Sequence, residues 1–142
     1  MREILFRGKR IDNGEWIYGF YFYDSFYNKA YITAGRYCMG ARERKPNQRI
    51  INAFEVDQKT VGQYTGLTDK NGTKIFEGDI VKYGDTVHNV VFEQRNGTAY
   101  FGLVYSTLET LSFGYYQDLK QIEVIGNIYD NPELMKGDEN KC

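Results

Sequence analysis

Two Asn-Gly pairs in the second half of the chain predict tight turns between strands. Asn71-Gly72 and Asn96-Gly97 each lie between segments rich in β-branched and aromatic residues. Both central positions of a type I′ turn need positive φ, which Asn and Gly adopt most readily. We therefore expect two β-hairpins here. Other strand candidates recur at roughly eight- to twelve-residue intervals, a spacing typical of β-barrels and β-sandwiches.

The longest predicted strand, residues 15–23, is aromatic or apolar on both of its faces. Alternation along a strand places Trp16 and Tyr18 on one face and Tyr21 and Tyr23 on the other. Such a strand is central in a sheet, or its second face meets a partner. These four residues are therefore candidates for self-association. Core packing and stacking on nucleic-acid bases remain the alternatives for the same rings.

Helical periodicity is scarce, because no window of about twelve residues sustains an i, i+3, i+4 apolar pattern. Residues 130–135 form the clearest short helix, with Pro132 suited to its first turn. The predicted fold is mainly β with little helix. An SH3-like or related small β-barrel with a short C-terminal helix is expected over residues 57–136. It packs with an N-terminal antiparallel β-sheet in residues 1–56, and residues 137–142 are a mobile tail.

Positive charge is concentrated in the first half of the chain. Residues 1–50 hold ten Lys or Arg and five Asp or Glu, whereas residues 51–142 hold eight and fourteen. The predicted loop 35–49 contains a basic cluster: Arg36, Arg42, Arg44, Lys45 and Arg49. This cluster could bind nucleic-acid phosphates or a protein partner. A solvated loop, or docking on an acidic face of a second copy, fits the same residues.

The residues that could support catalysis are few and isolated. His88 is the single histidine and shares a predicted strand face with apolar neighbours, so we expect it to be packed. Cys38 has no charged neighbour that would activate its thiol. Glu77 and Asp79 flank Gly78, and we expect this segment to turn a corner into a strand rather than bind a divalent ion. The sequence also has no zinc-ligand spacing and no nucleotide or hydrolase motif. We therefore predict no catalytic residue, no metal, no cofactor and no enzymatic activity.

Three stretches of the chain resemble the YopX family of phage and prophage proteins. They are residues 1–7 with 14–19 (MREILFR and GEWIYG), residues 60–72 with 74–81 (TVGQYTGLTDKNG and KIFEGDIV), and residues 122–134 (IEVIGNIYDNPEL). The segments 35–49 and 84–120 are less typical, so no role transfers to them. The resemblance implies a predominantly β fold in a protein encoded on phage DNA. It implies no catalytic residue, because the family has no established biochemical activity.

The function that we expect is that of a phage or prophage accessory protein, a non-catalytic binding or assembly module that self-associates. The alternative is a nucleic-acid-binding protein that uses residues 36–49. No segment approaches the roughly 18 apolar residues of a membrane span, and the apolar stretch at the N-terminus is too short for a secretion signal. Two distant cysteines fit a reducing compartment. We therefore expect a cytoplasmic protein of the bacterial host cell. Its partner would be a second copy, nucleic acid, or a host or phage protein, and not a membrane.

Overall fold

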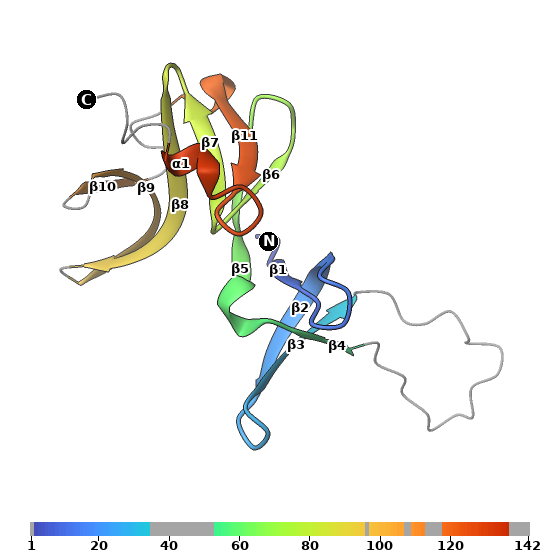
Figure 1. The fold of residues 1–142 in the computed structure, drawn as a ribbon. Helices are drawn as coiled ribbons and strands as arrows, with labels where there is room; N and C mark the ends of the chain where they lie inside the picture. Colours follow the sequence, from blue (N-terminus) through green and yellow to red (C-terminus); the bar gives the residue numbers. More distant parts are fainter. Residues whose placement is uncertain (1, 35–52, 96, 107–108, 113–117, 137–142) are drawn as a thin grey trace. The chain divides into compact units, whose positions relative to one another are not determined.

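The computed structural model describes residues 2–34, 53–95, 97–106, 109–112 and 118–136. Antiparallel strands dominate these residues, and α1 (Glu133–Lys136) is a short helix (Figure 1). The prediction of a mainly β fold with little helix is therefore confirmed. The chain divides into two compact units, Met1–Gln63 and Tyr64–Cys142. The boundary predicted from the sequence, between residues 56 and 57, lies seven residues before this one. The predicted loop 35–49 and the predicted tail 137–142 lie outside the described residues.

The first unit is an antiparallel sheet in the order β4-β3-β2-β1, with the start of β5 beside β1. Its strands are β1 (Phe6–Lys9), β2 (Trp16–Asp24), β3 (Lys29–Ala34) and β4 (Ala53–Val56). β2 and β3 form a hairpin in which Phe22 pairs with Tyr31 and Asp24 with Lys29. The segment that follows β1 lies beside β4, because the N–H of Ile11 donates a hydrogen bond of 3.1 Å to the carbonyl of Glu55. The turn η2 (Gln58–Thr60) then leads into β5 (Gly62–Thr68).

The inner face of this first sheet contains the apolar core of the unit. Ala30, Ile32 and Val56 are buried, and four partly buried residues pack against them: Phe6, Ile17, Tyr21 and Val61. Gly19 lies on this inner face, where a Cβ would stand 1.8 Å from the carbonyl oxygen of Thr33. Only glycine allows the backbones of β2 and β3 to approach so closely. Alternation along β2 therefore points Ile17, Gly19 and Tyr21 inward and their neighbours outward.

The second unit contains the end of β5, the short strand β6 (Lys74–Phe76) and a five-stranded sheet in the order β10-β9-β8-β7-β11. The strands of this sheet are β7 (Asp79–Tyr83), β8 (Thr86–Arg95), β9 (Thr98–Ser106), β10 (Glu109–Ser112) and β11 (Ile122–Asn127), which follows the turn η3 (Leu119–Gln121). Both predicted hairpins are confirmed. Thr68 pairs with Lys74 around Gly72, and Arg95 pairs with Thr98 beside Gly97. Both glycines have positive φ, at 80° and 76°, but Asn71 does not, so the turn at residues 71–72 is not of the type I′ that its Asn-Gly pair predicted.

The predicted SH3-like barrel is not closed. β10 and β11 lie at the two ends of the sheet, and no ladder among the described strands joins them. Strand length and turn chemistry are common to open and closed sheets, whereas closure also needs a consistent stagger between all neighbours. The β11–β7 ladder has a register shift between Val124 and Gly126, an irregularity that also occurs in closed barrels. With no described ladder between its end strands, the unit is an open antiparallel sheet.

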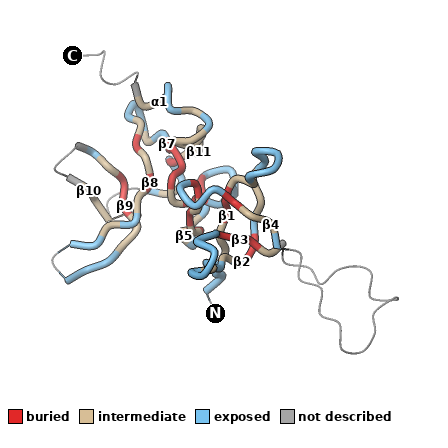
Figure 2. Tube along the Cα trace, turned by 60° about the horizontal axis from the view of Figure 1, so that its bottom comes forward, coloured by how far each residue is buried: buried red, intermediate tan, exposed pale blue. Residues whose placement is uncertain are grey.

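The core of the second unit is built from fully buried side chains of five strands. Figure 2 colours the buried residues of the described chain red. These side chains are Ile75, Val81, Val90, Leu103 and Ile122. Burying each such aliphatic side chain contributes about 1.5–3 kcal/mol. The alternating burial along β8 follows from the period of two that a half-buried strand has.

Candidate functional site

The first unit exposes large aromatic side chains on the outer face of its sheet. Tyr18, Phe20 and Phe22 alternate along β2 and point away from the core, and we call these three residues the aromatic face. Phe20 is 61% exposed and Phe22 is 44% exposed. Phe22 stacks on Tyr31 of the neighbouring strand, with ring centroids 5.1 Å apart and ring planes at 16°. The stack holds the Phe22 ring in place without removing it from solvent.

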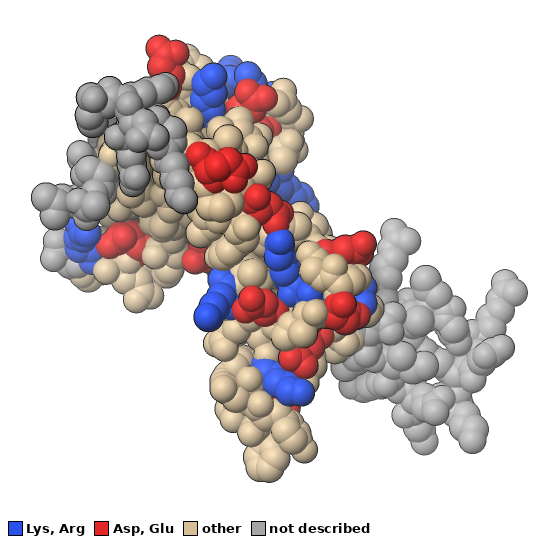
Figure 3. Space-filling view, in the orientation of Figure 1, with Lys and Arg blue, Asp and Glu red and all other residues tan. Residues whose placement is uncertain are grey.

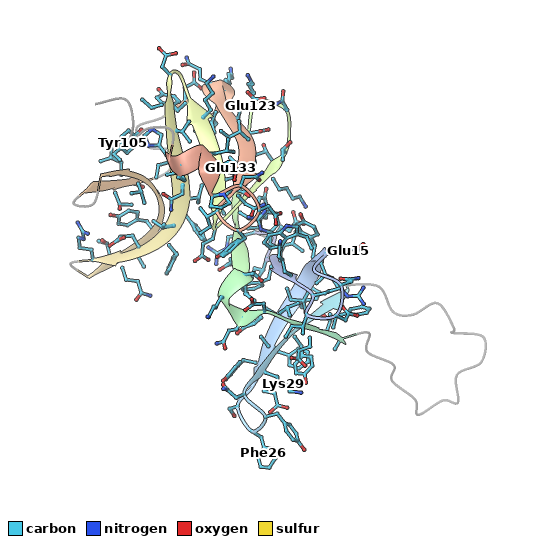
Figure 4. The ribbon with its side chains drawn as sticks, viewed as in Figure 1. Glu15, Phe26, Lys29, Tyr105, Glu123 and Glu133 are labelled. Carbon is cyan, nitrogen blue, oxygen red and sulfur yellow. The ribbon has the colours of Figure 1, made fainter. Side chains whose placement is uncertain are left out.

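The turn between β2 and β3 carries two further exposed rings. Phe26 and Tyr27 are 84% and 66% exposed, and we call this pair the aromatic tip. Asp24 Oδ1 accepts hydrogen bonds from the backbone N–H groups of Phe26 at 2.9 Å and Tyr27 at 3.2 Å. The two rings meet edge to face, 4.8 Å apart at 81°. Figure 4 shows Phe26 at the end of the hairpin, pointing away from the sheet.

Charged groups flank the aromatic face rather than lie within it. Lys29 and Glu55 form an ion pair of 3.4 Å. At the opposite end of β2, the Arg7 guanidinium carbon and Lys9 Nζ lie 4.7 and 5.5 Å from the centre of the Trp16 ring, a cation–π arrangement. The space-filling view shows an uncharged surface over the end of the β2–β3 hairpin (Figure 3). The exposed rings of Phe20, Phe22 and Phe26 make this part of the first unit rich in apolar groups, and exposed apolar patches mark interaction sites.

The four residues that the sequence predicted for self-association occupy different environments in the structure. Tyr18 belongs to the aromatic face, and Tyr23 is 41% exposed beside the tip. Trp16 is half-buried beneath its two cations. Tyr21 points into the core, where its ring lies 5.5 Å from that of Phe6. Alternation alone could not separate these cases, because both faces of the strand are aromatic.

Sequence reasoning missed the most exposed members of the surface. Phe20 and Phe22 share the outer face with Tyr18, whereas Phe26 and Tyr27 lie in a turn. Turns between strands are usually built from Gly, Asn, Asp, Ser and Pro. Two adjacent aromatic residues in a turn were therefore the signal that could have revealed the tip. The basic candidates of the predicted loop lie outside the described residues: Arg36, Arg42, Arg44, Lys45 and Arg49.

His88 has a structural environment in the second unit. It is 5% exposed, and its Nδ1–H donates to the carbonyl of Val104 at 2.9 Å. Its Nε2 lies 2.8 Å from Thr86 Oγ1, and its ring lies 4.1 Å from that of Tyr105. Both ring nitrogens therefore have partners inside the fold. The prediction of a packed histidine agrees with this geometry.

Asp79, one of the two acidic candidates of the second unit, also serves the fold. Asp79 is 2% exposed, and its Oδ2 accepts the N–H of Phe76 at 2.7 Å across the corner at Gly78. This is the corner that the sequence predicted. Within the ranges described above, no group of three His, Cys, Asp or Glu residues could hold a metal ion.

Two hollows of about 270 and 290 Å³ in the second unit share Lys70 in their walls. Lys120 lines one hollow and Lys82 the other. Each hollow also has one acidic residue in its wall: Asp69 lines the first, and Glu123, which pairs with Lys70 at 3.3 Å, lines the second. The acid in each wall offsets one of the two Lys, and the aromatic face is the stronger candidate.

The fold and the surface together define a mainly β protein of two sheet units with an exposed aromatic face. The chain belongs to the YopX protein family, whose model matches residues 5–136. It is also similar to protein EF1440 from Enterococcus faecalis, whose crystal structure matches with a TM-score of 0.58 at 22% identity, covering 95% of this chain and 99% of that chain. That likeness supports the fold alone. No curated protein matches the chain. Among the described residues, no helix is long and apolar enough to cross a membrane.

Proposed function

We propose that this protein is a non-catalytic assembly module that self-associates through the aromatic face. The observation that carries the proposal is the outward orientation of Tyr18, Phe20 and Phe22 on a strand whose other side already packs the core. A phage or prophage origin and action in the cytoplasm of the bacterial host belong to the same proposal. Membership of the YopX family supports the phage or prophage origin.

Apolar burial supplies the driving force for the proposed contact. Burying a Phe side chain contributes about 1.5–3 kcal/mol, and sheets pack face to face at a separation of about 10 Å. The aromatic face consists of three side chains along about 13 Å of one strand. We therefore expect the area that it buries to be smaller than the roughly 800 Å² per partner of a stable interface. Because association also loses translational and rotational entropy, we expect a weak and reversible dimer.

Nucleic acid fits the aromatic face less well than a second protein surface does. Strand-tracking nucleic-acid sites combine stacking rings with cations that neutralise phosphates. On the described outer face, Lys29 is paired with Glu55, and Arg7 and Lys9 lie over Trp16. The two Phe rings offer no polar atom to a base edge. An apolar protein surface therefore suits this face better.

Nucleic-acid binding through residues 36–49 is the second candidate function. The five basic side chains of this segment in the sequence support it. Such binding would weaken steeply with salt, because each neutralised phosphate releases counterions. A gel-shift experiment with single- and double-stranded DNA and RNA at two salt concentrations tests it. No shift, or a shift that salt does not change, would exclude this function.

Light scattering and analytical ultracentrifugation of the full chain test the proposed self-association. We expect a mass that rises with concentration toward a dimer, and a mass that stays near the monomer for the double variant Phe20→Ser, Phe22→Ser. Phe92→Ser is the matched control, because Phe92 lies in the second unit and is as exposed as Phe22, at 44%. A strict monomer at high concentration, or equal effects of the variant and the control, would contradict the proposal.

A further inference from the structure

We infer that the contact between two copies is reciprocal, with the aromatic tip of each copy packed on the Tyr18 end of the partner's aromatic face. This inference rests on the proposed function, because it describes how the same surface meets a second copy. It makes Phe26 an anchoring residue and Asp24 a positioning residue. Both roles follow from the geometry of the β2–β3 hairpin.

The aromatic tip is ordered before any partner binds. Asp24 Oδ1 accepts the N–H groups of both Phe26 and Tyr27, and the turn closes at Asn28 with a φ of 55°. The two rings also support each other edge to face. An exposed ring that is already held in place loses little entropy on binding, which is the property of an anchoring residue.

The spacing along the hairpin suits a two-fold contact. Tyr18 precedes Phe22 by four residues, about 13 Å of strand, and on the other side of Phe22 the strand ends at Asp24 and leads into the turn that carries Phe26. A two-fold axis that lies between the two faces, perpendicular to β2 and level with Phe22, would run the two strands antiparallel and bring each tip over the partner's Tyr18. Both copies then bury the tip as well as the face. This arrangement buries more apolar area than the aromatic face would bury alone.

The position of Asp24 favours this arrangement over a tip-to-tip dimer. Asp24 lies on the outer face, two residues beyond Phe22. Lys29 is its partner in the strand register, but the ammonium group of Lys29 forms an ion pair with Glu55. Parallel packing of the two β2 strands would bring the two Asp24 carboxylates together in a desolvated contact, where like charges repel strongly. Antiparallel packing about Phe22 separates them by about 13 Å along the strands, beyond the screening length of roughly 8–10 Å.

Disulfide trapping distinguishes the two arrangements. Cys38→Ser and Cys142→Ser remove the native thiols, and Tyr18→Cys and Phe26→Cys are then made in separate chains with tags of different size. We expect mild oxidation of the mixture to yield the mixed Tyr18→Cys and Phe26→Cys dimer. A Phe92→Cys chain serves as the control and should yield none. Self-linked Phe26→Cys dimers, or no mixed product, would overturn the inference.

Asp24 variants provide a second measurement that does not depend on cysteine. Asp24→Ala removes the acceptor of both tip N–H groups, so we expect the dimer dissociation constant to rise about three- to tenfold through lost preorganisation. Asp24→Asn keeps an Oδ1 acceptor and should restore dimerisation to at least the wild-type affinity. Equal losses in both variants, or no loss in Asp24→Ala, would overturn the positioning role.

The outcomes separate this inference from the proposed function. If the Phe20→Ser, Phe22→Ser variant dimerises like the Phe92→Ser control, the proposed function fails, and the inference fails with it. If that variant stays monomeric but the trapped dimers are linked tip to tip, the proposed function stands and only the reciprocal geometry is overturned.

Discussion

Asp69 Oδ2 accepts a hydrogen bond of 2.9 Å from the backbone N–H of Val124, which lies 55 positions away in the sequence. The other carboxylate oxygen accepts the N–H groups of Asn71 at 2.8 Å and Thr73 at 2.9 Å. One buried side chain therefore holds the β5–β6 turn in shape and ties it to β11. The N–H of Lys70 donates to the carbonyl of Ile122 at 3.0 Å beside it.

The stability that Asp69 contributes should depend on pH. Burial by itself raises the pKa of this carboxyl group, but hydrogen bonds from Val124, Thr73 and Asn71 and the charge of Lys70 outweigh burial and hold the pKa below its ordinary value of 3.8. A lowered folded-state pKa stabilises the fold above the unfolded-state pKa, and this contribution is lost as the pH falls through the folded-state pKa. We expect Asp69→Ala to lower the free energy of unfolding by about 1–3 kcal/mol at pH 6.

Urea denaturation at pH 6 and pH 3 measures this contribution. The difference between wild type and Asp69→Ala should shrink at pH 3, which lies below the ordinary pKa of 3.8, because the stabilisation by the charged carboxylate is progressively lost there. Asp85→Asn, at an exposed turn, should be near neutral at both values of pH. A difference that is equal at both values of pH would show that the charge of Asp69 does not matter.

Gly19→Ala should destabilise the first unit through a steric clash. The added Cβ would lie 1.8 Å from the carbonyl oxygen of Thr33, so β2 and β3 must separate. We expect a loss of about 2–3 kcal/mol in thermal or chemical unfolding. Gly84→Ala is the control for the backbone effect alone, because Gly84 has a φ of 60° and no atom lies within 4 Å of an added Cβ. We expect it to lower the free energy of unfolding by about 1 kcal/mol. Equal losses would mean that the clash at Gly19 relaxes freely.

His88→Ala should lower stability without changing self-association. The substitution leaves the carbonyl of Val104 without the donor that His88 supplies and opens space beside Tyr105. We expect about 1–3 kcal/mol in the free energy of unfolding. Sedimentation of the folded variant should give the wild-type dimer constant. A folded variant that no longer dimerises would instead place the second unit in the contact.

Salt should leave the proposed dimer intact. Apolar contacts gain or keep strength as ionic strength rises, whereas phosphate binding weakens. We therefore expect the dimer constant from sedimentation to be the same or tighter in about 0.5 M NaCl than in about 0.05 M NaCl. A dimer that dissociates at high salt would assign the contact to charged residues rather than to Phe20 and Phe22.

Turn chemistry and strand period were readable from the sequence because they are local. The Asn-Gly turn at residue 72, the Gly-Asp corner at Asp79 and the alternation along β2 each depend on neighbouring residues, so the mainly β class and both hairpins could be predicted. The same patterns also carried the family resemblance. Closure of the second sheet was predicted and did not occur, because strand stagger depends on every ladder at once.

The tertiary structure decided which aromatic residues reach solvent. Tyr18 and Tyr21 are alike in sequence context, since both lie in a strand that is aromatic on either side. Tyr21 shares its face with Ile32 of the paired strand β3 and with Val56 of β4, which pack together in the core, whereas Tyr18 on the other face is 47% exposed. Local sequence thus determined that the strand has two faces. Which of the two is buried depended on long-range packing, because burial is a property of the neighbours that the fold brings together.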